Sequence, residues 1–232
     1  MKEIAQADGL PDWKKELRGL RSTFDVIEST VQCGGRDFIL AQPRDYDALI
    51  SEADFVKDDR LPYWADLWPS SRVLADHVAR QKGRGRRALE LGCGSGLVSC
   101  ALAHAEYRVT ATDYYDDALR FTRVNAARNS GKRIVTRHVD WRDLPRDLGE
   151  FDIVVAADVL YEHTYGELVA DAVAEALAPD GFALIADPGR LALESFLQAS
   201  EERGLMIEEK WDVPWTEGGQ KQLIQLFAIR FR

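Results

Sequence analysis

A glycine-rich stretch with one acidic residue in front of it is the part of the sequence whose spacing most clearly indicates chemistry. It reads Glu90-Leu-Gly92-Cys93-Gly94-Ser-Gly96 and lies between a short apolar run and apolar residues at helical spacing. Glycines here allow a tight turn and let a ligand approach the main chain. A turn that needs small residues for its own sake is the alternative. Because the loop would join a strand to a helix, we favour a ligand site.

The spacing of the loop excludes the common phosphate-binding motifs. The dinucleotide motif G-x-G-x-x-G would need a third glycine at Leu97 or at Ser99, depending on the register, and neither residue is glycine. A loop of the G-x-x-x-x-G-K-[ST] type is absent as well. Glu90 would repel a pyrophosphate, but its carboxylate can accept a hydrogen bond from an ammonium group. The ligand should therefore carry a positive charge and no phosphate.

Two further acidic residues follow predicted strands and could complete this site. Asp113 ends a strand where a carboxylate can accept from both hydroxyls of a ribose, and a solvated loop aspartate is the alternative. Asp140 precedes Trp141, so it could accept from an adenine amine while the indole covers the ring, or it could cap a turn. A nucleoside with a positively charged amino-acid tail and no phosphate satisfies all three requirements.

These acidic residues belong to a regular alternation of strands and helices. Strands are expected over residues 88–91, 108–112, 134–139, 153–157 and 182–186, and helices over 97–104, 116–129, 165–177 and 191–203. Continuous apolar strands separated by helices are typical of a parallel sheet covered on both faces. The last two strands, 206–213 and 222–231, have too short a connection for a crossover helix and should pair antiparallel.

The predicted fold class is therefore α/β. We expect a Rossmann-like, doubly wound, mostly parallel seven-stranded sheet that ends in an antiparallel hairpin. An N-terminal helix and β-hairpin precede it, over residues 13–20, 24–31 and 38–42, and a helix over 70–81 follows with Pro69 in its first turn. We divide the chain into an N-terminal extension, residues 1–60, and a ligand-binding domain, residues 61–232.

Composition is that of one globular domain with a small appendage. The chain has 232 residues and no apolar run near the roughly 20 residues that span a bilayer. The N-terminal residues mix acids and bases, which argues against a secretory signal and predicts a cytoplasmic location. Cys33, Cys93 and Cys100 lack C-x-x-C spacing, which favours reduced thiols. A net charge of −9 makes nucleic acid an improbable partner and is compatible with a cationic one.

From residue 88 to the C-terminus the sequence resembles the class I S-adenosylmethionine-dependent methyltransferases, chiefly through the E-L-G-x-G-x-G loop. Residues 63–69 (Y-W-A-D-L-W-P) and 158–161 (D-V-L-Y) are similar to the group that includes lysine methyltransferases of non-histone proteins. Residues 187–190 (D-P-G-R) are similar to the subgroup that acts on the β-subunit of electron transfer flavoprotein.

The resemblance implies S-adenosyl-L-methionine as cofactor, S-adenosyl-L-homocysteine as its product, and no metal. The indole N–H of Trp68 would point at the methionine carboxylate, or Trp68 would be a core anchor. The candidate cofactor-binding residues are Trp68, Glu90, Gly92, Cys93, Gly94, Gly96, Asp113, Tyr114, Asp140, Trp141 and Ala157. The candidate substrate contacts are Tyr63, Trp64, Glu162, Asp187, Arg190 and Trp215, the last in the loop of the terminal hairpin.

Asp158 and Tyr161 are the candidate catalytic residues, because they follow the fourth parallel strand. A lysine amine has a pKa of about 10.4, so making it neutral at pH 7 costs roughly 4–5 kcal/mol. A carboxylate favours the charged form, so we expect Asp158 to capture and orient the amine rather than deprotonate it. Tyr161 could wall the acceptor with its ring face, or it could be a packing aromatic.

The predicted function is N-methylation of an exposed protein lysine by direct in-line transfer (EC 2.1.1.-), by an enzyme that acts as a monomer and does not contact membranes. A small-molecule amine or azine N-methyltransferase is the first alternative, because only the rim of the pocket would differ. A nucleic-acid methyltransferase is disfavoured, because residues 158–161 lack the paired prolines common in base-amine enzymes. A non-catalytic nucleoside-binding adaptor is the remaining alternative.

Overall fold

The computed structural model describes residues 12–45, 49 and 61–232. The rest of the expected extension, including the boundary placed after residue 60, lies outside the described residues, and that boundary stays a prediction. The helices are α1 (Trp13–Thr23), η2 (a 3-10 turn, Tyr63–Ala65), α3 (Pro69–Ala79), α4 (Leu97–His104), α5 (Asp116–Ser130), α6 (Tyr165–Ala176) and α7 (Leu193–Glu202). None of the helices in this part of the chain is long and apolar enough to cross a membrane.

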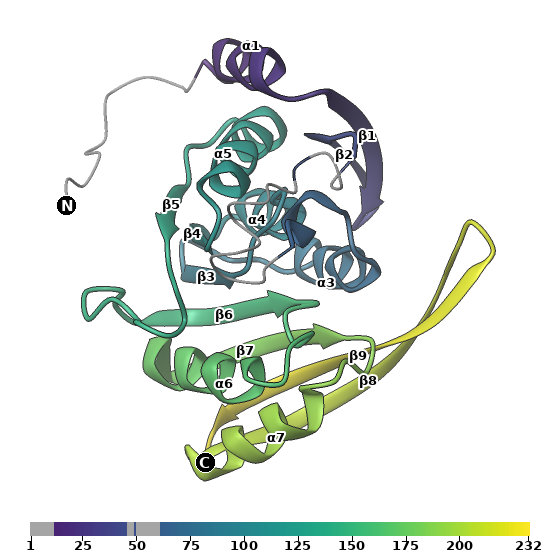
Figure 1. Ribbon diagram of the computed structural model, residues 1–232. Helices are drawn as coiled ribbons and strands as arrows, with labels where there is room; N and C mark the ends of the chain where they lie inside the picture. Colours follow the sequence, from purple (N-terminus) through teal and green to yellow (C-terminus); the bar gives the residue numbers. More distant parts are fainter. Residues whose placement is uncertain (1–11, 46–48, 50–60) are drawn as a thin grey trace.

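The strands form a small hairpin and one large sheet. Their bounds are β1 (Val26–Cys33), β2 (Arg36–Pro43), β3 (Arg87–Leu91), β4 (Arg108–Asp113), β5 (Val135–His138), β6 (Phe151–Ala157), β7 (Leu177–Asp187), β8 (Leu205–Glu217) and β9 (Gln220–Phe231). The large sheet has the order β5-β4-β3-β6-β7-β9-β8. The five strands β3 to β7 are parallel to one another, and β9 pairs antiparallel with both β7 and β8. The predicted doubly wound, seven-stranded fold is confirmed (Figure 1).

Helices cover both faces of the sheet because its central strands are apolar on both. Ile153 and Val155 of β6 face a core cluster built with α3, α4 and α5. Val154 and Ala156 of the same strand face a second cluster built with α6 and α7. Figure 1 shows these two helix layers on either side of the strands. A strand buried on both faces has no polar alternation, which is why its sequence is a continuous apolar run.

The N-terminal helix α1 and the hairpin of β1 and β2 pack against α5. Two asparagines of α5 bind the backbone of β2. The Asn125 amide accepts from the Ala41 N–H and donates to the Ala41 carbonyl, each at 2.8 Å. It also donates to the Ser95 carbonyl, in the glycine-rich loop, at 2.8 Å. Asn129 makes the same pair of bonds with Ile39, at 2.8 and 2.9 Å. The hairpin is thereby connected to the loop that the sequence singles out.

The terminal hairpin differs from the prediction in its loop. The predicted first strand ends at residue 213, but β8 continues to Glu217 and pairs with β9 up to Gln220. Only Gly218 and Gly219 turn the chain, with φ of 58° and 82°, as a tight two-residue hairpin turn requires. Trp215 is therefore a strand residue opposite Gln222, and its placement in a loop is wrong.

The contact between α6 and α7 depends on the absence of a side chain at Gly166. A Cβ at this position would overlap the Ser195 hydroxyl and lie 2.8 Å from the backbone nitrogen of Phe196, at the start of α7. Gly19 in α1 is a matched case with the opposite surroundings, since a Cβ there would have no atom within 4 Å. Alanine at Gly19 therefore changes only helix propensity, whereas alanine at Gly166 also disturbs packing.

We predict that alanine changes the free energy of unfolding in opposite directions at these two positions. Gly19→Ala should stabilise the fold by up to about 1 kcal/mol, because alanine favours helix. Gly166→Ala should destabilise it by about 1–3 kcal/mol, because the backbone of α7 must move. The free energy of unfolding from urea titration measures both. Equal stabilisation by the two variants would contradict the close packing of α6 on α7.

Candidate functional site

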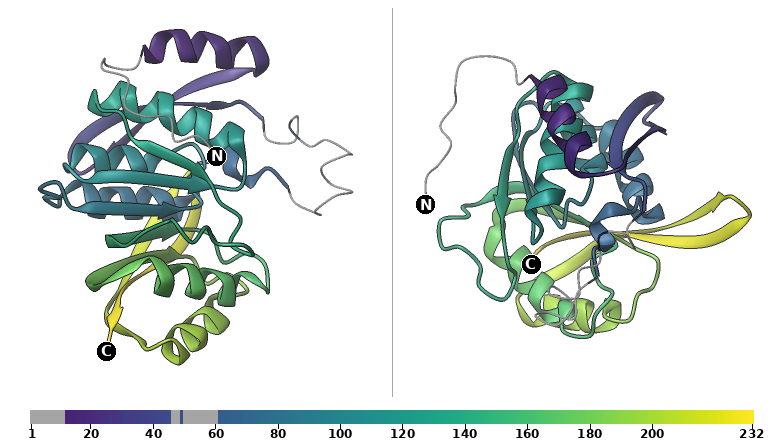
Figure 2. Two further views of the ribbon diagram at one scale, coloured as in Figure 1. Left: turned by 90° about the vertical axis from the view of Figure 1, so that its left-hand side faces the viewer. Right: turned by 45° about the horizontal axis from the view of Figure 1, so that its top comes forward.

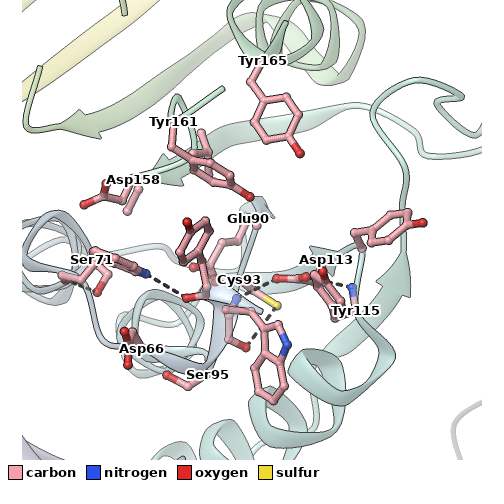
Figure 3. A pocket seen from close by; sticks show the side chains of 18 of the residues that line it. Asp66, Ser71, Glu90, Cys93, Ser95, Asp113, Tyr115, Asp158, Tyr161 and Tyr165 are labelled. Atoms are coloured by element: carbon pink, nitrogen blue, oxygen red, sulfur yellow. Dashed lines mark hydrogen bonds between the residues drawn. The ribbon is translucent and has the colours of Figure 1, made fainter. Parts of the chain in front are cut away.

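A cavity of about 450 Å³ lies at the carboxyl ends of β3, β4 and β6. In Figure 3, Asp113 and Asp158 stand on opposite sides of it, with Glu90 and Cys93 between them. This size is within the range of small-molecule sites. The predicted site residues that line it are Tyr63, Trp64, Trp68, Glu90, Gly92, Cys93, Gly94, Asp113, Tyr114, Asp140, Trp141, Ala157, Asp158, Tyr161, Glu162 and Arg190.

The glycines of the loop are required by the protein's own packing. Gly92, Gly94 and Gly96 have φ of 68°, 51° and 86°, which side chains rarely adopt. A Cβ at Gly92 or Gly94 would lie 2.9 Å from Val159 or from the Trp64 carbonyl oxygen, respectively. The alternative of a turn that needs small residues therefore accounts for these glycines by itself, although Gly92 and Gly94 do line the cavity.

Gly96 is not among the residues that line the cavity, and its role as a cofactor contact stays a prediction. It is the N-cap of α4, and a Cβ there would lie 2.6 Å from the Thr122 hydroxyl. Gly96 therefore lets α4 pack against α5 directly behind the loop. Its contribution to the site is the position of the loop.

Glu90 forms the floor of the cavity and is almost completely buried. The Ser99 hydroxyl of α4 donates a short hydrogen bond to its carboxylate. Burial raises the pKa of Glu90 to about 8, and the nearby charge of Asp113 adds to this while Ser99 opposes it. The Glu90 carboxyl is therefore partly protonated at pH 7 to 8, and a cation placed beside it favours its charged form.

Asp113 ends β4 and is held by the glycine-rich loop. Its carboxylate accepts from the backbone N–H of Gly94 at 2.9 Å and of Tyr115 at 3.0 Å. Burial raises its pKa, and these backbone bonds oppose the rise. The backbone N–H of Tyr114 is a third donor, and since a carboxylate has about four acceptor sites it can still accept from a ligand. The carboxylate is thus fixed in orientation and faces the cavity as an acceptor.

Asp140 and Trp141 follow β5 and line the cavity. The Asp140 carboxylate is bound by the Arg142 guanidinium, with a shortest contact of 2.6 Å, and by the Arg142 N–H at 3.0 Å. The turn role considered for Asp140 is therefore present, alongside its exposure to the cavity. Trp141 contacts the Tyr165 ring edge-on at 5.4 Å and forms an apolar wall.

Trp68 lines the cavity, but its indole N–H is already used. It donates to the backbone carbonyl of Tyr63 at 2.9 Å, five residues earlier. This bond favours the alternative that Trp68 is an anchor, and a contact of the N–H with a ligand carboxylate stays a prediction. The bond connects η2 to Trp68, the residue that precedes α3. Trp68 contributes a ring face, which the Arg190 guanidinium covers at 5.1 Å.

Three tyrosine rings form a continuous wall beside Asp158. Tyr161 contacts Tyr63 at 5.4 Å and Tyr165 at 5.1 Å, both edge-on. Burial is the main cause that raises the pKa of Tyr161, so its hydroxyl stays protonated at neutral pH. Such a wall suits an aliphatic chain that ends in an amine. Tyr165 was not singled out from the sequence, because it reads as the first apolar residue of α6.

The Asp158 carboxylate has two protein partners. Arg190 Nε donates to Oδ1 at 2.7 Å, and the Ser70 hydroxyl donates to Oδ2 at 2.8 Å. Asp158 has a φ of 60°, and its side chain is only 2% exposed. Arg190 therefore competes with an incoming amine for this carboxylate, and capture of the amine by Asp158 stays a prediction. Neither Ser70 nor this pairing was predicted.

Asp187 and Trp215 do not line the cavity, contrary to their prediction as substrate contacts. Asp187 is fully buried at the end of β7, and its Oδ1 accepts from the backbone N–H of Gly189 at 2.7 Å and of Arg190 at 2.6 Å. It shapes the loop that carries Arg190. Trp215 packs against the core cluster on the α3 side of the sheet.

The arrangement favours binding of a cation over covalent catalysis. Burial raises the pKa of the Cys93 thiol well above its usual value, so this thiol is not a nucleophile at neutral pH. Among the described residues, no group of three or more His, Cys, Asp or Glu side chains could hold a metal ion. The cavity thus has an acidic floor at Glu90, a wall of aromatic rings, and the ion pair of Asp158 with Arg190.

Comparison with known proteins agrees with this picture. A family model described as "Methyltransferase domain" matches residues 88–181. Electron transfer flavoprotein beta subunit lysine methyltransferase of Xenopus laevis is 33% identical over 141 residues, which cover 58% of this chain and 55% of the relative. Protein-lysine methyltransferase METTL21E of Mus musculus is 31% identical over 118 residues, covering 45% and 48%. The chain thus spans about half the length of the curated relatives it matches.

A solved structure shows the same fold. The TehB-like SAM-dependent methyltransferase from Corynebacterium glutamicum superposes with a TM-score of 0.54 at 19% identity, covering 78% of this chain and 94% of that one. The solved structure adds a likeness of fold. With the loop from Glu90 to Gly96 and the strand order, the family model and the curated relatives identify residues 88–181 as a class I S-adenosylmethionine-dependent methyltransferase domain.

Proposed function

We propose that the protein transfers a methyl group from S-adenosylmethionine to a lysine side chain of another protein. The observation that supports this most is the cavity itself, in which buried carboxylates on one side face a wall of tyrosines on the other. A cationic cofactor suits the first side, and an alkyl amine suits the second. Two similar proteins carry lysine methyltransferase in their names.

The residues of the cofactor side fit S-adenosylmethionine. Glu90 would accept from its ammonium group, and Asp113 would accept from the ribose hydroxyls with the lone pairs left by Gly94 and Tyr115. Trp141 would cover the adenine. When bound, this cofactor supplies an electrophilic methyl carbon on a sulfonium, which the acceptor nitrogen attacks in line as the carbon–sulfur bond breaks. Such a displacement needs orientation and exclusion of water, with no metal.

The acceptor side would hold the amine between Tyr161 and the ion pair of Asp158 with Arg190. The Tyr161 hydroxyl is protonated at neutral pH, so its ring acts as a wall. Glu162, Tyr63 and Trp64 line the cavity and would contact the acceptor. A small-molecule amine would use the same wall, and it is the alternative outcome of the labelling experiment below. The monomeric state and the cytoplasmic location stay predictions.

The raised pKa of Glu90 predicts that cofactor affinity depends on pH. Since Glu90 is largely protonated below pH 8 and must be charged to bind an ammonium, binding should release a proton. Between pH 6.0 and 7.5 the affinity for S-adenosylhomocysteine should rise by up to about tenfold per pH unit. Calorimetry in buffers of different ionisation enthalpy measures both effects.

Two substitutions control for this effect. Glu90→Gln should remove the pH dependence and the proton release. Glu150→Gln, at an exposed position, should behave like the unmodified protein. A flat affinity between pH 6.0 and 7.5 in the unmodified protein would exclude the proposed role of Glu90.

Substitution of Asp113 tests whether the ligand is a nucleoside without phosphate or a dinucleotide. Asp113→Asn keeps the shape of the side chain but replaces one acceptor oxygen with a donor, so S-adenosylhomocysteine should bind about 10–100-fold more weakly, an expected loss of about 1.4–2.8 kcal/mol. NAD should not bind detectably above pH 8, where Glu90 is largely charged and repels a pyrophosphate. Calorimetric titration of both ligands checks this. Tight binding of NAD without binding of S-adenosylhomocysteine would contradict the cofactor assignment.

Labelling of a host lysate tests the acceptor. The protein is incubated with lysate and S-adenosylmethionine that carries an isotopically labelled methyl group, and modified residues are identified by mass spectrometry. We expect one dominant modified lysine, and its replacement by arginine in the purified acceptor should abolish labelling. Label confined to the small-molecule fraction would favour the alternative acceptor, and absence of any transfer would exclude the proposed function.

A further inference from the structure

Arg190 is held at the acceptor side of the cavity by three separate contacts. Its Nε donates to Asp158 at 2.7 Å, and its guanidinium lies 5.1 Å from the centre of the Trp68 ring. Its backbone N–H donates to Asp187 at 2.6 Å, so the loop itself is tied to the end of β7. The guanidinium is thus fixed by a carboxylate and by a ring face, and the backbone of the same residue by a second carboxylate.

This fixation determines what an incoming amine meets. Both side chains line the cavity, but the Asp158 side chain is 2% exposed and the Arg190 side chain is 33% exposed. The second oxygen of Asp158 is bound by Ser70. An amine that enters between the tyrosines therefore meets more of the guanidinium than of the carboxylate.

Arg190 is also the only basic side chain among the described residues that line the cavity. The other lining groups that can carry a negative charge would attract a cation and keep an amine protonated. Asp187 adds a further carboxylate directly behind Asp158, although it does not line the cavity. The acidic and ionisable lining groups besides Asp158 are Asp66, Glu90, Asp113, Asp140, Glu162, Cys93, Tyr63, Tyr114, Tyr115, Tyr161 and Tyr165.

We propose that Arg190 is a specificity-determining residue, which neutralises Asp158 and makes the acceptor side select an uncharged nitrogen. This inference rests on the proposed function. A nitrogen can attack a methyl carbon only with its lone pair free, so the ammonium proton must leave to water first. The second proton leaves the nitrogen after the new carbon–nitrogen bond forms. A fixed guanidinium disfavours the ammonium form and so promotes the first of these losses.

The test is the pH dependence of kcat at saturating acceptor, because kcat reports ionisation in the bound complex. The acceptor is the purified protein in which the labelling experiment finds the modified lysine. In the unmodified enzyme kcat should rise with pH and reach its plateau well below the ordinary lysine value of about 10.4. Arg190→Gln should shift the midpoint of this rise upward by about 1–2 pH units.

Other variants separate charge from structure. Arg190→Lys should keep the midpoint near that of the unmodified enzyme, because it keeps the charge. The double variant Arg190→Gln with Asp158→Asn should lie between Arg190→Gln and the unmodified enzyme. Arg203→Gln is the matched control, since Arg203 Nε also binds an aspartate oxygen, at 2.6 Å, but on the surface. It should leave the midpoint unchanged.

Thermal melting without cofactor or acceptor gives a second readout. Arg190→Gln leaves a buried carboxylate unpaired and should lower the melting temperature by more than about 5 °C, whereas the double variant should recover most of this loss. The inference is overturned if Arg190→Gln lowers kcat without moving the midpoint, or improves acceptor binding because Asp158 becomes available. If the unmodified enzyme transfers no methyl group at all, the proposed function fails instead, and the melting result still decides whether Arg190 neutralises Asp158.

Discussion

Burial of acidic side chains at the ends of neighbouring strands is the constraint on which the rest of the site depends. Glu90, Asp113, Asp158 and Asp187 lie near the carboxyl ends of β3, β4, β6 and β7, and all four are buried. A buried carboxylate without partners is strongly unfavourable. The surrounding loops therefore take the paths that bring a hydroxyl, backbone N–H groups or a guanidinium to each of them.

The kind of partner differs between the two sides of the cavity, and this difference gives the site its chemistry. Glu90 and Asp113 are bound by neutral donors, a hydroxyl and backbone N–H groups, so a cationic ligand can draw each of them into its charged form. Asp158 is bound by a guanidinium and is already compensated. The same residue type thus favours a cation on one side and tolerates a neutral group on the other.

The fold was largely predictable because it depends on local patterns. Apolar runs bounded by glycines or charges gave every strand of the sheet, and the helices between them were predicted to within a few residues at each end. The start of β7, at Leu177 rather than 182, and the terminal hairpin were the exceptions. In the hairpin the alternation of Trp211, Val213 and Trp215 continues, but Pro214 is typical of a loop, and pairing with β9 carries the edge strand through it.

The sequence by itself determined which residue types reach the site, because strand ends in a parallel sheet converge on one edge whatever the loops do. Only the tertiary structure decided their partners. Arg190 and Asp158 are 32 residues apart, and Ser70 and Asp158 are 88 apart, so no spacing rule relates them. Which donor reaches which carboxylate depends on loop paths that form when helices pack on the finished sheet. For that reason the charge state of the site follows from the fold.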